Sequence, residues 1–255
     1  MSVASEDILF AVNDEIAEIR INRPDRMNAM TRPMYARIDE LIREIGSRDD
    51  VAVGIITGEG DRAFSAGADL YLYHTEGEEP EPWGPWVPDR WDWGSASAKP
   101  LIAAVNGYAL AGGLELALVC DIRVASSNAQ FGAAEAKRGL IGAVNTYLLP
   151  RAVGLSLAME MLLIGQPIGA EQALAAGLVS RVVEPDRLVD TAYTVARAIR
   201  ENPRQGLAMT RELTARGRNL SFEDHCRLAK SYVALSSRLD EQHQALDAFR
   251  SGARS

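Results

Sequence analysis

The chain has 255 residues, 47% of them hydrophobic, which is enough to bury the core of one α/β domain with a helical addition. A formal charge of −8 disfavours binding to nucleic acid or to anionic lipid. The chain begins with acidic residues and no apolar leader, and it contains no run of about 18 apolar residues. We therefore expect a cytoplasmic protein with no membrane partner.

The first predicted element is a β-hairpin, followed by a helix. Residues 8–12 and 16–21 are apolar and rich in strand-forming residues, and the polar triplet between them is typical of a turn. Thr31 is a suitable N-cap, and Pro33 stands just inside the helix. Apolar side chains then recur on one helix face up to Gly46, at Met34, Ile38, Leu41, Ile42 and Ile45.

The rest of the chain alternates strands with helices and then becomes helical. Residues 51–57 and 101–105 are continuous apolar runs that predict buried strands. Strands that alternate with helices indicate crossover connections. Helical patterns close the chain at residues 188–199, 204–216, 222–237 and 240–249. We expect an α/β core in residues 1–186 and a C-terminal helical region in residues 187–255.

Two motifs after the strand at residues 51–57 suggest other enzyme classes. The residues from Gly58 to Ala63 match G-x-G-x-x-A, but no helix is predicted to begin at these glycines, so a dinucleotide site is disfavoured. Ser65 stands near the pattern G-x-S-x-G, with Ala63 where the first glycine belongs. A serine hydrolase therefore remains a testable alternative.

Histidines and cysteines give no catalytic or metal-binding pattern. His74, His225 and His243 lie far apart in the sequence, and we expect them at the surface or at an interface. Cys120 and Cys226 fit neither a disulfide framework nor a zinc-ligand spacing. We expect two reduced thiols and no metal site.

The centre of the chain combines a strand with paired glycines. After the strand at residues 101–105, a Gly-rich turn leads from Asn106 to Gly112 and Gly113, before a helix that begins near Leu114. Backbone N–H groups at a helix start are unpaired and attract negative charge, so this turn is suited to form an oxyanion hole. The alternative is that the glycines only allow two backbones to pack closely.

Two glutamates follow this turn. Glu115 lies in the first predicted helical turn among apolar residues, where helix capping is the simple alternative to catalysis. Glu135 ends the segment of residues 131–135 and by itself would pass for a surface acid. Two carboxylates in different environments can hold opposite protonation states, as acid–base chemistry requires.

Taken together, these stretches resemble the enoyl-CoA hydratase/isomerase (crotonase) family over most of the chain. The resemblance depends on the order and spacing of five segments, namely residues 22–30, 63–70, 99–121, 129–135 and 173–183. It implies a crotonase-like α/β fold, with repeated ββα units in a spiral core. It also implies that the C-terminal helical region serves oligomerisation and covers the active site.

The resemblance assigns roles by position. The backbone N–H groups of Ala68 and Gly112 would form the oxyanion hole for the thioester oxygen. Glu115 and Glu135 match the two catalytic acids of the hydratases. Coenzyme A would lie along the loop that precedes the tryptophan-rich segment, at Ala66, Ala68, Asp69, Leu70 and Gly112.

Retention of both acids implies an enoyl-CoA hydratase, which adds water reversibly to an α,β-unsaturated acyl-CoA thioester. The resemblance implies no metal and no separate cofactor, because coenzyme A arrives as part of the substrate. It also implies a homotrimer or hexamer. Double-bond isomerisation, dehydration of another hydroxyacyl-CoA and thioester hydrolysis are the alternatives within the family. A non-catalytic acyl-CoA-binding protein is an alternative of another class.

Two segments depart from the hydratase pattern. Where hydratases read P-G-x-G-G-T-Q-R-L after the second acid, Val144 and Asn145 replace two of the glycines. Residues 76–93 contain all four tryptophans and stand where the family has its acyl-covering segment. We expect these side chains to cover the acyl group and to select bulky or long chains, at Trp83, Trp86, Trp91 and Trp93. The alternative is that they only pack at an interface.

Overall fold

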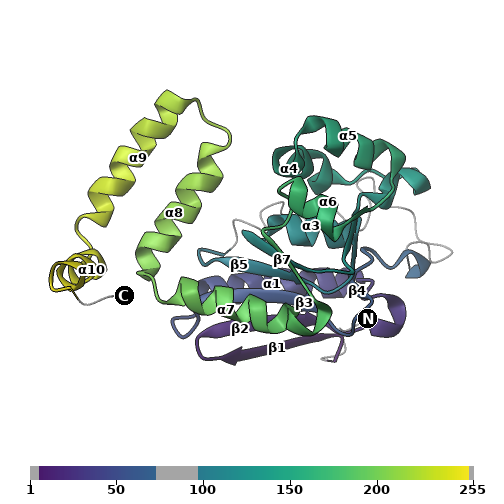
Figure 1. The fold of residues 1–255 in the computed structure, drawn as a ribbon, viewed down its shortest axis with the longest axis horizontal. Coiled ribbons are helices and arrows are strands. Elements are labelled where there is room, and N and C mark those ends of the chain that lie inside the picture. The colour runs from purple at the N-terminus through teal and green to yellow at the C-terminus, as the bar shows by residue number, and fades with distance from the viewer. Residues whose placement is uncertain (1–5, 73–96, 253–255) are drawn as a thin grey trace.

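The computed structural model describes residues 6–72 and 97–252, so the predictions for His74 and for the tryptophans of residues 76–93 lie outside the described residues. Two β-sheets form the centre of the molecule, and the last helices extend to one side of it (Figure 1). The α/β class predicted from the sequence is confirmed.

The larger sheet has six strands and begins with the predicted hairpin. Its strand order is β1-β2-β3-β5-β7-β10, in which β1 and β2 are antiparallel and the other neighbours are parallel. Asp14 and Glu15 both have positive φ angles, of 51° and 61°, as the favoured two-residue hairpin turn requires. The strands are β1 (Ile8–Asn13), β2 (Ile16–Ile21), β3 (Val53–Gly58), β5 (Leu101–Val105), β7 (Ile122–Ser126) and β10 (Arg181–Val183).

The smaller sheet has four short strands in the order β4-β6-β8-β9, and its pairings are parallel except between β8 and β9. Each of β3, β5 and β7 in the larger sheet is followed in the chain by a strand of the smaller sheet. The chain therefore alternates between the two sheets as it advances, which is the expected spiral of ββα units. The short strands are β4 (Ala63–Ser65), β6 (Tyr108–Leu110), β8 (Gln130–Gly132) and β9 (Ile168–Gly169).

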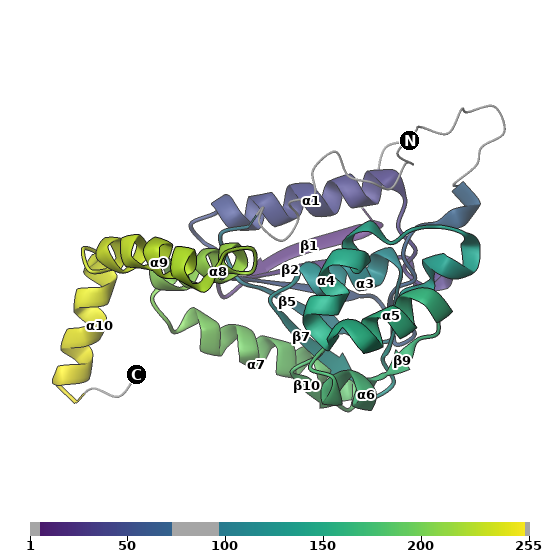
Figure 2. The same cartoon turned by 90° about the horizontal axis from the view of Figure 1, so that it is seen from above.

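Helices cover both faces of the larger sheet. In Figure 2, α1 (Arg32–Ser47) and α7 (Leu188–Arg200) lie on opposite sides of it. Successive side chains of strand β5 point to opposite faces of the sheet. Leu101 and Ala103 pack in the cluster that contains α1, whereas Ile102 packs in the cluster that contains α7. The five apolar residues predicted for the α1 face are all fully buried.

The helices of the middle of the chain, from α3 to α6, were only partly predicted. α3 (Gly112–Val119) begins two residues earlier than expected, at the first of the paired glycines. α4 (Ala143–Val153), α5 (Leu155–Ile164) and α6 (Ala170–Ala175) follow it in the chain and lie close to it (Figure 1). Short 3-10 helices connect strands and helices along the whole chain, at η1 (Pro24–Arg26), η2 (Leu70–Leu72), η3 (Ala134–Arg138) and η4 (Pro185–Arg187).

The chain ends in three further helices, as predicted, α8 (Arg204–Gly217), α9 (Phe222–Ser236) and α10 (Asp240–Arg250). α8 and α9 lie side by side, away from the two sheets (Figures 1 and 2). Among the apolar residues of α9 and its C-terminal end, Leu228, Tyr232 and Leu239 are partly buried and Leu235 is 52% exposed. Among the described residues, the model contains no helix of the length and apolar character that a membrane span needs.

Candidate active site

The loop after β4 meets the start of α3. A Cβ atom on Gly67, whose φ is +86°, would lie 2.9 Å from the backbone nitrogen of Gly112, so Ala68 stands beside the first turn of α3. The N–H of Gly112 opens the helix and has no acceptor within it. Outside helices and strands, neither Ala68 nor Gly112 donates a backbone hydrogen bond to another described residue. These two N–H groups are the donors predicted for the thioester oxygen, and that role stays a prediction.

The residues around this turn are tightly constrained. Ala111 has a φ of 49°, which is uncommon for a residue other than glycine and strains the backbone at this turn. A Cβ on Gly113 would lie 2.1 Å from the carbonyl oxygen of Ser65, so this glycine lets α3 pack against β4. Close packing thus accounts for Gly113, and it also accounts for Gly112, where a Cβ would lie 2.2 Å from the hydroxyl oxygen of Tyr35.

The structure brings the two glutamates together at the start of α4. Oε1 of Glu115 accepts hydrogen bonds from the backbone N–H groups of Val144, at 3.0 Å, and Asn145, at 3.4 Å. Oε1 of Glu135 accepts one from Nδ2 of the same Asn145, at 2.8 Å. Two acids that are 20 positions apart in the sequence are therefore joined through one residue.

Burial and mutual repulsion alter the ionisation of this pair. Burial, followed by the charge of Glu135, raises the pKa of Glu115 from 4.5 to about 7, against the two backbone hydrogen bonds, which lower it. Burial also raises the pKa of Glu135, although the hydrogen bond from Asn145 opposes that shift. With both pKa values raised, the pair retains a proton at a higher pH than isolated glutamates would.

Gly142 matches a glycine of the hydratase pattern, within the segment that otherwise differs from that pattern. A Cβ at this position would lie 2.3 Å from Oε1 of Glu135, so only a glycine lets the carboxylate approach the backbone here. Val144 and Asn145, which replace two glycines of the hydratase pattern, supply the donors to Glu115. These two residues thus donate to Glu115 through their backbone N–H groups, and Asn145 adds an amide side chain beside Glu135.

The loop predicted to hold coenzyme A is fixed by an internal ion pair. The Asp69 carboxylate is buried and accepts a hydrogen bond from Nη1 of Arg23 at 3.0 Å. The backbone N–H of Ala66 donates to the carbonyl of Met27 at 2.9 Å, while Leu70 is 37% exposed. The Asp69 side chain therefore orders the loop, and contact with coenzyme A stays a prediction for this segment.

Ser65 is poorly placed for nucleophilic chemistry. Its buried hydroxyl donates to the carbonyl of Asn28 at 2.8 Å and accepts from the N–H of Gly67 at 3.1 Å. His225 and His243 lie on α9 and α10, remote in the fold from β4 (Figure 1). In residues 6–72 and 97–252, no histidine is positioned to act as its base, and no group of three or more His, Cys, Asp or Glu side chains is placed to bind a metal.

Sequence reasoning missed Tyr35. This residue follows Met34 on α1 and belongs to no motif, yet its hydroxyl oxygen would lie 2.2 Å from a Cβ on Gly112. Burial raises the pKa of Tyr35, and the charges of Glu115 and Glu135 raise it further, so the phenol stays protonated beside the turn. Only the packing of α1 against α3 places it there, and no sequence pattern indicates that.

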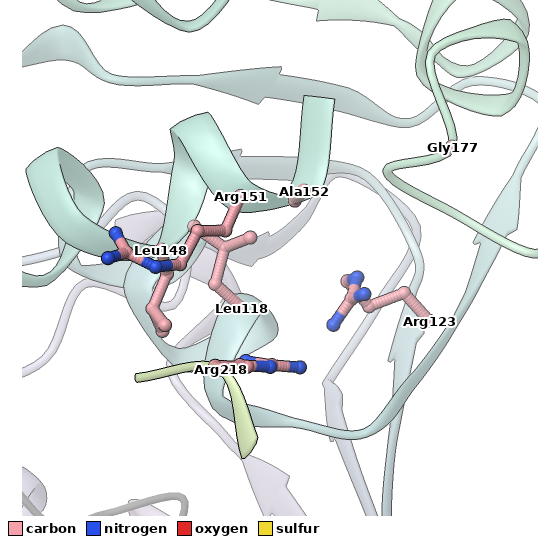
Figure 3. Close-up of a pocket in the computed structure, with 7 residues that line it drawn as sticks. All are labelled: Leu118, Arg123, Leu148, Arg151, Ala152, Gly177 and Arg218. Atoms are coloured by element: carbon pink, nitrogen blue, oxygen red, sulfur yellow. The ribbon is translucent and has the colours of Figure 1, made fainter. Parts of the chain in front are cut away.

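A separate cavity of about 420 Å³ lies at the other end of α3. It is lined by Leu118, Arg123, Leu148, Arg151, Ala152, Gly177 and Arg218, and by none of the predicted site residues (Figure 3). Arg123 and Arg218 point toward one another, and Arg151 is turned away, stacked on the ring of Tyr147 at 3.7 Å. Nε of Arg123 donates to the carbonyl of Leu178, so this arginine supports the backbone.

Comparison with known proteins decides the family. The enoyl-CoA hydratase/isomerase family model matches residues 11–250. The chain is 36% identical to (E)-benzylidenesuccinyl-CoA hydratase of Thauera aromatica, over 85% of each chain. It is 34% identical to short-chain-enoyl-CoA hydratase of Clostridium acetobutylicum, over 95% of this chain and 94% of that one. The chain belongs to the enoyl-CoA hydratase/isomerase family.

Solved structures agree with this crotonase-family assignment. Enoyl-CoA hydratase subunit I of Geobacillus kaustophilus superposes with a TM-score of 0.90 at 32% identity, over 97% of this chain and 96% of that one. An enoyl-CoA hydratase of Mycobacterium tuberculosis gives a TM-score of 0.86 at 30% identity, over 98% and 97%. The predicted crotonase fold is confirmed, and the protein is a crotonase-family enzyme of acyl-CoA thioesters.

Proposed function

We propose that this protein is an enoyl-CoA hydratase, which adds water reversibly across the double bond of an α,β-unsaturated acyl-CoA thioester. The observation that supports this most directly is the joint placement of Glu115 and Glu135, both bonded to Asn145 beside the start of α3. Hydration removes one proton from the water that attacks the β-carbon and delivers one proton to the α-carbon, and a pair of acids can perform both transfers.

In the proposed reaction, the oxygen of water forms a bond to the β-carbon and a proton is added at the α-carbon. One glutamate accepts a proton from the water, and a glutamate delivers a proton to the α-carbon, so no net charge is left on the product. The negative charge that develops on the thioester oxygen is stabilised by the N–H groups of Ala68 and Gly112.

The named relatives support hydration over the other reactions of the family. The proteins from T. aromatica and C. acetobutylicum are both hydratases, and each matches most of this chain. Their substrates differ in size and polarity, so the acyl group is not assigned by likeness. A trimer or hexamer, a coenzyme A contact along residues 66–70 and a cytoplasmic location belong to the same proposal.

A panel of enoyl-CoA thioesters with short, long and aromatic acyl chains tests the proposal. Hydration removes the conjugation between the double bond and the thioester, so absorbance of the conjugated thioester should fall and then level off at equilibrium. A change in double-bond position without uptake of water, measured by mass spectrometry, would instead assign an isomerase. Binding of acyl-CoA without turnover of any substrate in the panel would assign a non-catalytic binder.

A further inference from the structure

Asn145 is hydrogen-bonded to both glutamates of the candidate site. It lies in the first turn of α4 and is fully buried. Its backbone N–H donates to Glu115 and its side-chain amide donates to Glu135, at 2.8 Å. In the hydratase pattern this position is a glycine, which has no side chain to offer, so the amide is an addition relative to that pattern.

The orientation of the amide follows from its neighbours. Nδ2 faces two acceptors, Oε1 of Glu135 at 2.8 Å and the carbonyl oxygen of Ala111 at 3.2 Å. A reversed amide would place an oxygen against both of these oxygens. Both amide hydrogens are therefore used, and Oδ1 occupies the other side of the group.

Two buried acceptors remain in this unit. Oδ1 of Asn145 and Oε2 of Glu135 are both buried, and neither has a hydrogen-bond partner in the part of the chain that the structure describes. A buried acceptor without a donor costs about 1–3 kcal/mol, so native proteins seldom keep one without a function. Both atoms belong to groups that are already hydrogen-bonded to one another, and both require a donor.

We propose that Asn145 is a further site residue, whose Oδ1 accepts a hydrogen bond from the water that adds to the acyl chain, or from the hydroxyl that leaves in the reverse direction. This inference rests on the proposed hydratase function. Water carries two O–H donors, and one of them donates to Oδ1 while the other faces a carboxylate. The amide exchanges no proton and only orients the oxygen toward the β-carbon.

The other half of the amide acts on Glu135. A hydrogen bond from Nδ2 favours the ionised carboxylate, because a charged oxygen is a stronger acceptor than the oxygen of a protonated carboxyl group. It thus opposes the effect of burial, which raises the pKa of Glu135. Asn145 therefore helps the pair to keep one carboxylate ionised while Glu115 retains its proton to about neutral pH.

Two substitutions at this position separate the two halves of the amide. Asn145→Leu keeps a similar volume and removes both polar atoms, whereas Asn145→Asp keeps an acceptor and removes the donor to Glu135. Thr146→Ala is the matched control, because Thr146 is the next residue, is exposed, and its hydroxyl bonds only locally, to Ala143. Each protein is assayed on an enoyl-CoA that the parent hydrates, and its carboxylates are titrated by ¹³C NMR of labelled glutamate.

We expect Asn145→Leu to lower kcat for hydration about 10- to 100-fold, with KM changed less than about threefold, because the amide orients water and does not bind coenzyme A. In both variants the pKa of Glu135 should rise, and more so in Asn145→Asp, where a third carboxylate repels the pair. Thr146→Ala should change neither property. A purely structural role would lower thermal stability without moving the titration of Glu135.

The inference is overturned if folded Asn145→Leu hydrates within threefold of the parent, or if Glu135 titrates alike in parent and variants. Should Asn145→Leu fail to fold, Asn145→Asp decides through the same NMR titration. The proposed function fails in a different way, when the parent itself hydrates no enoyl-CoA of the panel. The titration then still reports whether the amide controls Glu135.

Discussion

Helices near the two ends of this chain have similar amphipathic patterns, but they bury their apolar side chains to different extents. α1 buries five apolar side chains completely against the larger sheet. α8, α9 and α10 bury none, and they leave Phe222 84% exposed and Phe249 82% exposed. The same kind of sequence pattern is thus satisfied within the core but unsatisfied in the C-terminal helices (Figure 2).

This contrast indicates different roles for the two regions, with the candidate catalytic residues in the core and an expected interface on the C-terminal helices. The core fixes the glutamates through backbone and side-chain hydrogen bonds within one chain. Large apolar side chains that stay exposed together on terminal helices indicate a protein interface. We therefore expect the C-terminal helices to be completed by other copies of the chain.

The largest effect is expected in the core, at the catalytic pair. Glu115→Gln and Glu135→Gln should each lower kcat about 10²- to 10⁴-fold, because each removes a positioned proton-transfer group. The double variant should lose much less than the product of the two losses, since the two acids act as one unit. Steady-state hydration kinetics give these values.

A matched control lies in the C-terminal helices. Glu223→Gln removes an exposed acid of α9 that, among the described residues, pairs with its helix neighbour Arg227, and it should leave kcat unchanged within about twofold. Near-normal hydration in either core variant would contradict the proposed roles. Retained isomerisation with lost hydration in Glu115→Gln would indicate a single-acid isomerase that depends on Glu135.

The two regions should also differ in what one aromatic side chain contributes to stability. Phe64→Ala removes a fully buried side chain and should lower the free energy of unfolding by about 3–5 kcal/mol. Phe249→Ala removes an exposed one and should change it by less than about 0.5 kcal/mol in the isolated chain. Urea unfolding at several protein concentrations measures both. A concentration-dependent loss in Phe249→Ala would show that an interface buries this residue.

A smaller effect follows from the ionisation of Glu115. Its pKa is raised from 4.5 to about 7 in the folded protein, so the native state keeps a proton that the unfolded chain releases. Relative to Glu115→Gln, the parent should therefore lose up to about 3 kcal/mol of stability as the pH rises from about 4.5 to about 7, and no more above that. Urea unfolding at pH 4.5, 6 and 8 should show this slope. A stability difference that is constant with pH would refute it.

The smallest effect on the fold is expected at the exposed face of α9. Val233→Asp combined with Leu235→Asp places charges on side chains that are 65% and 52% exposed. The core should keep its stability within about 0.5 kcal/mol, while light scattering should show a mass below that of the parent trimer or hexamer. A parent that stays a stable monomer at micromolar concentration would contradict the assembly itself.

Long periodic segments were predictable from sequence alone. The hairpin, the buried face of α1, the strands β3 and β5 and the four C-terminal helices all appear where their patterns indicate them. Each of these segments spans five residues or more, so its own alternation or helical repeat specifies it. The family resemblance added the roles of the glutamates and the glycine turn, which the structure places in one region of the core.

Tertiary structure decided the rest. The strands of the smaller sheet have only two or three residues, too few for a repeat, and they become strands because distant segments pair with them. Asn145 looked only like a lost glycine, and Tyr35 like a helix residue without a motif. Their relation to the glutamates depends on how α1, α3 and α4 pack, because hydrogen bonds and burial in the folded core join residues that no local sequence pattern connects.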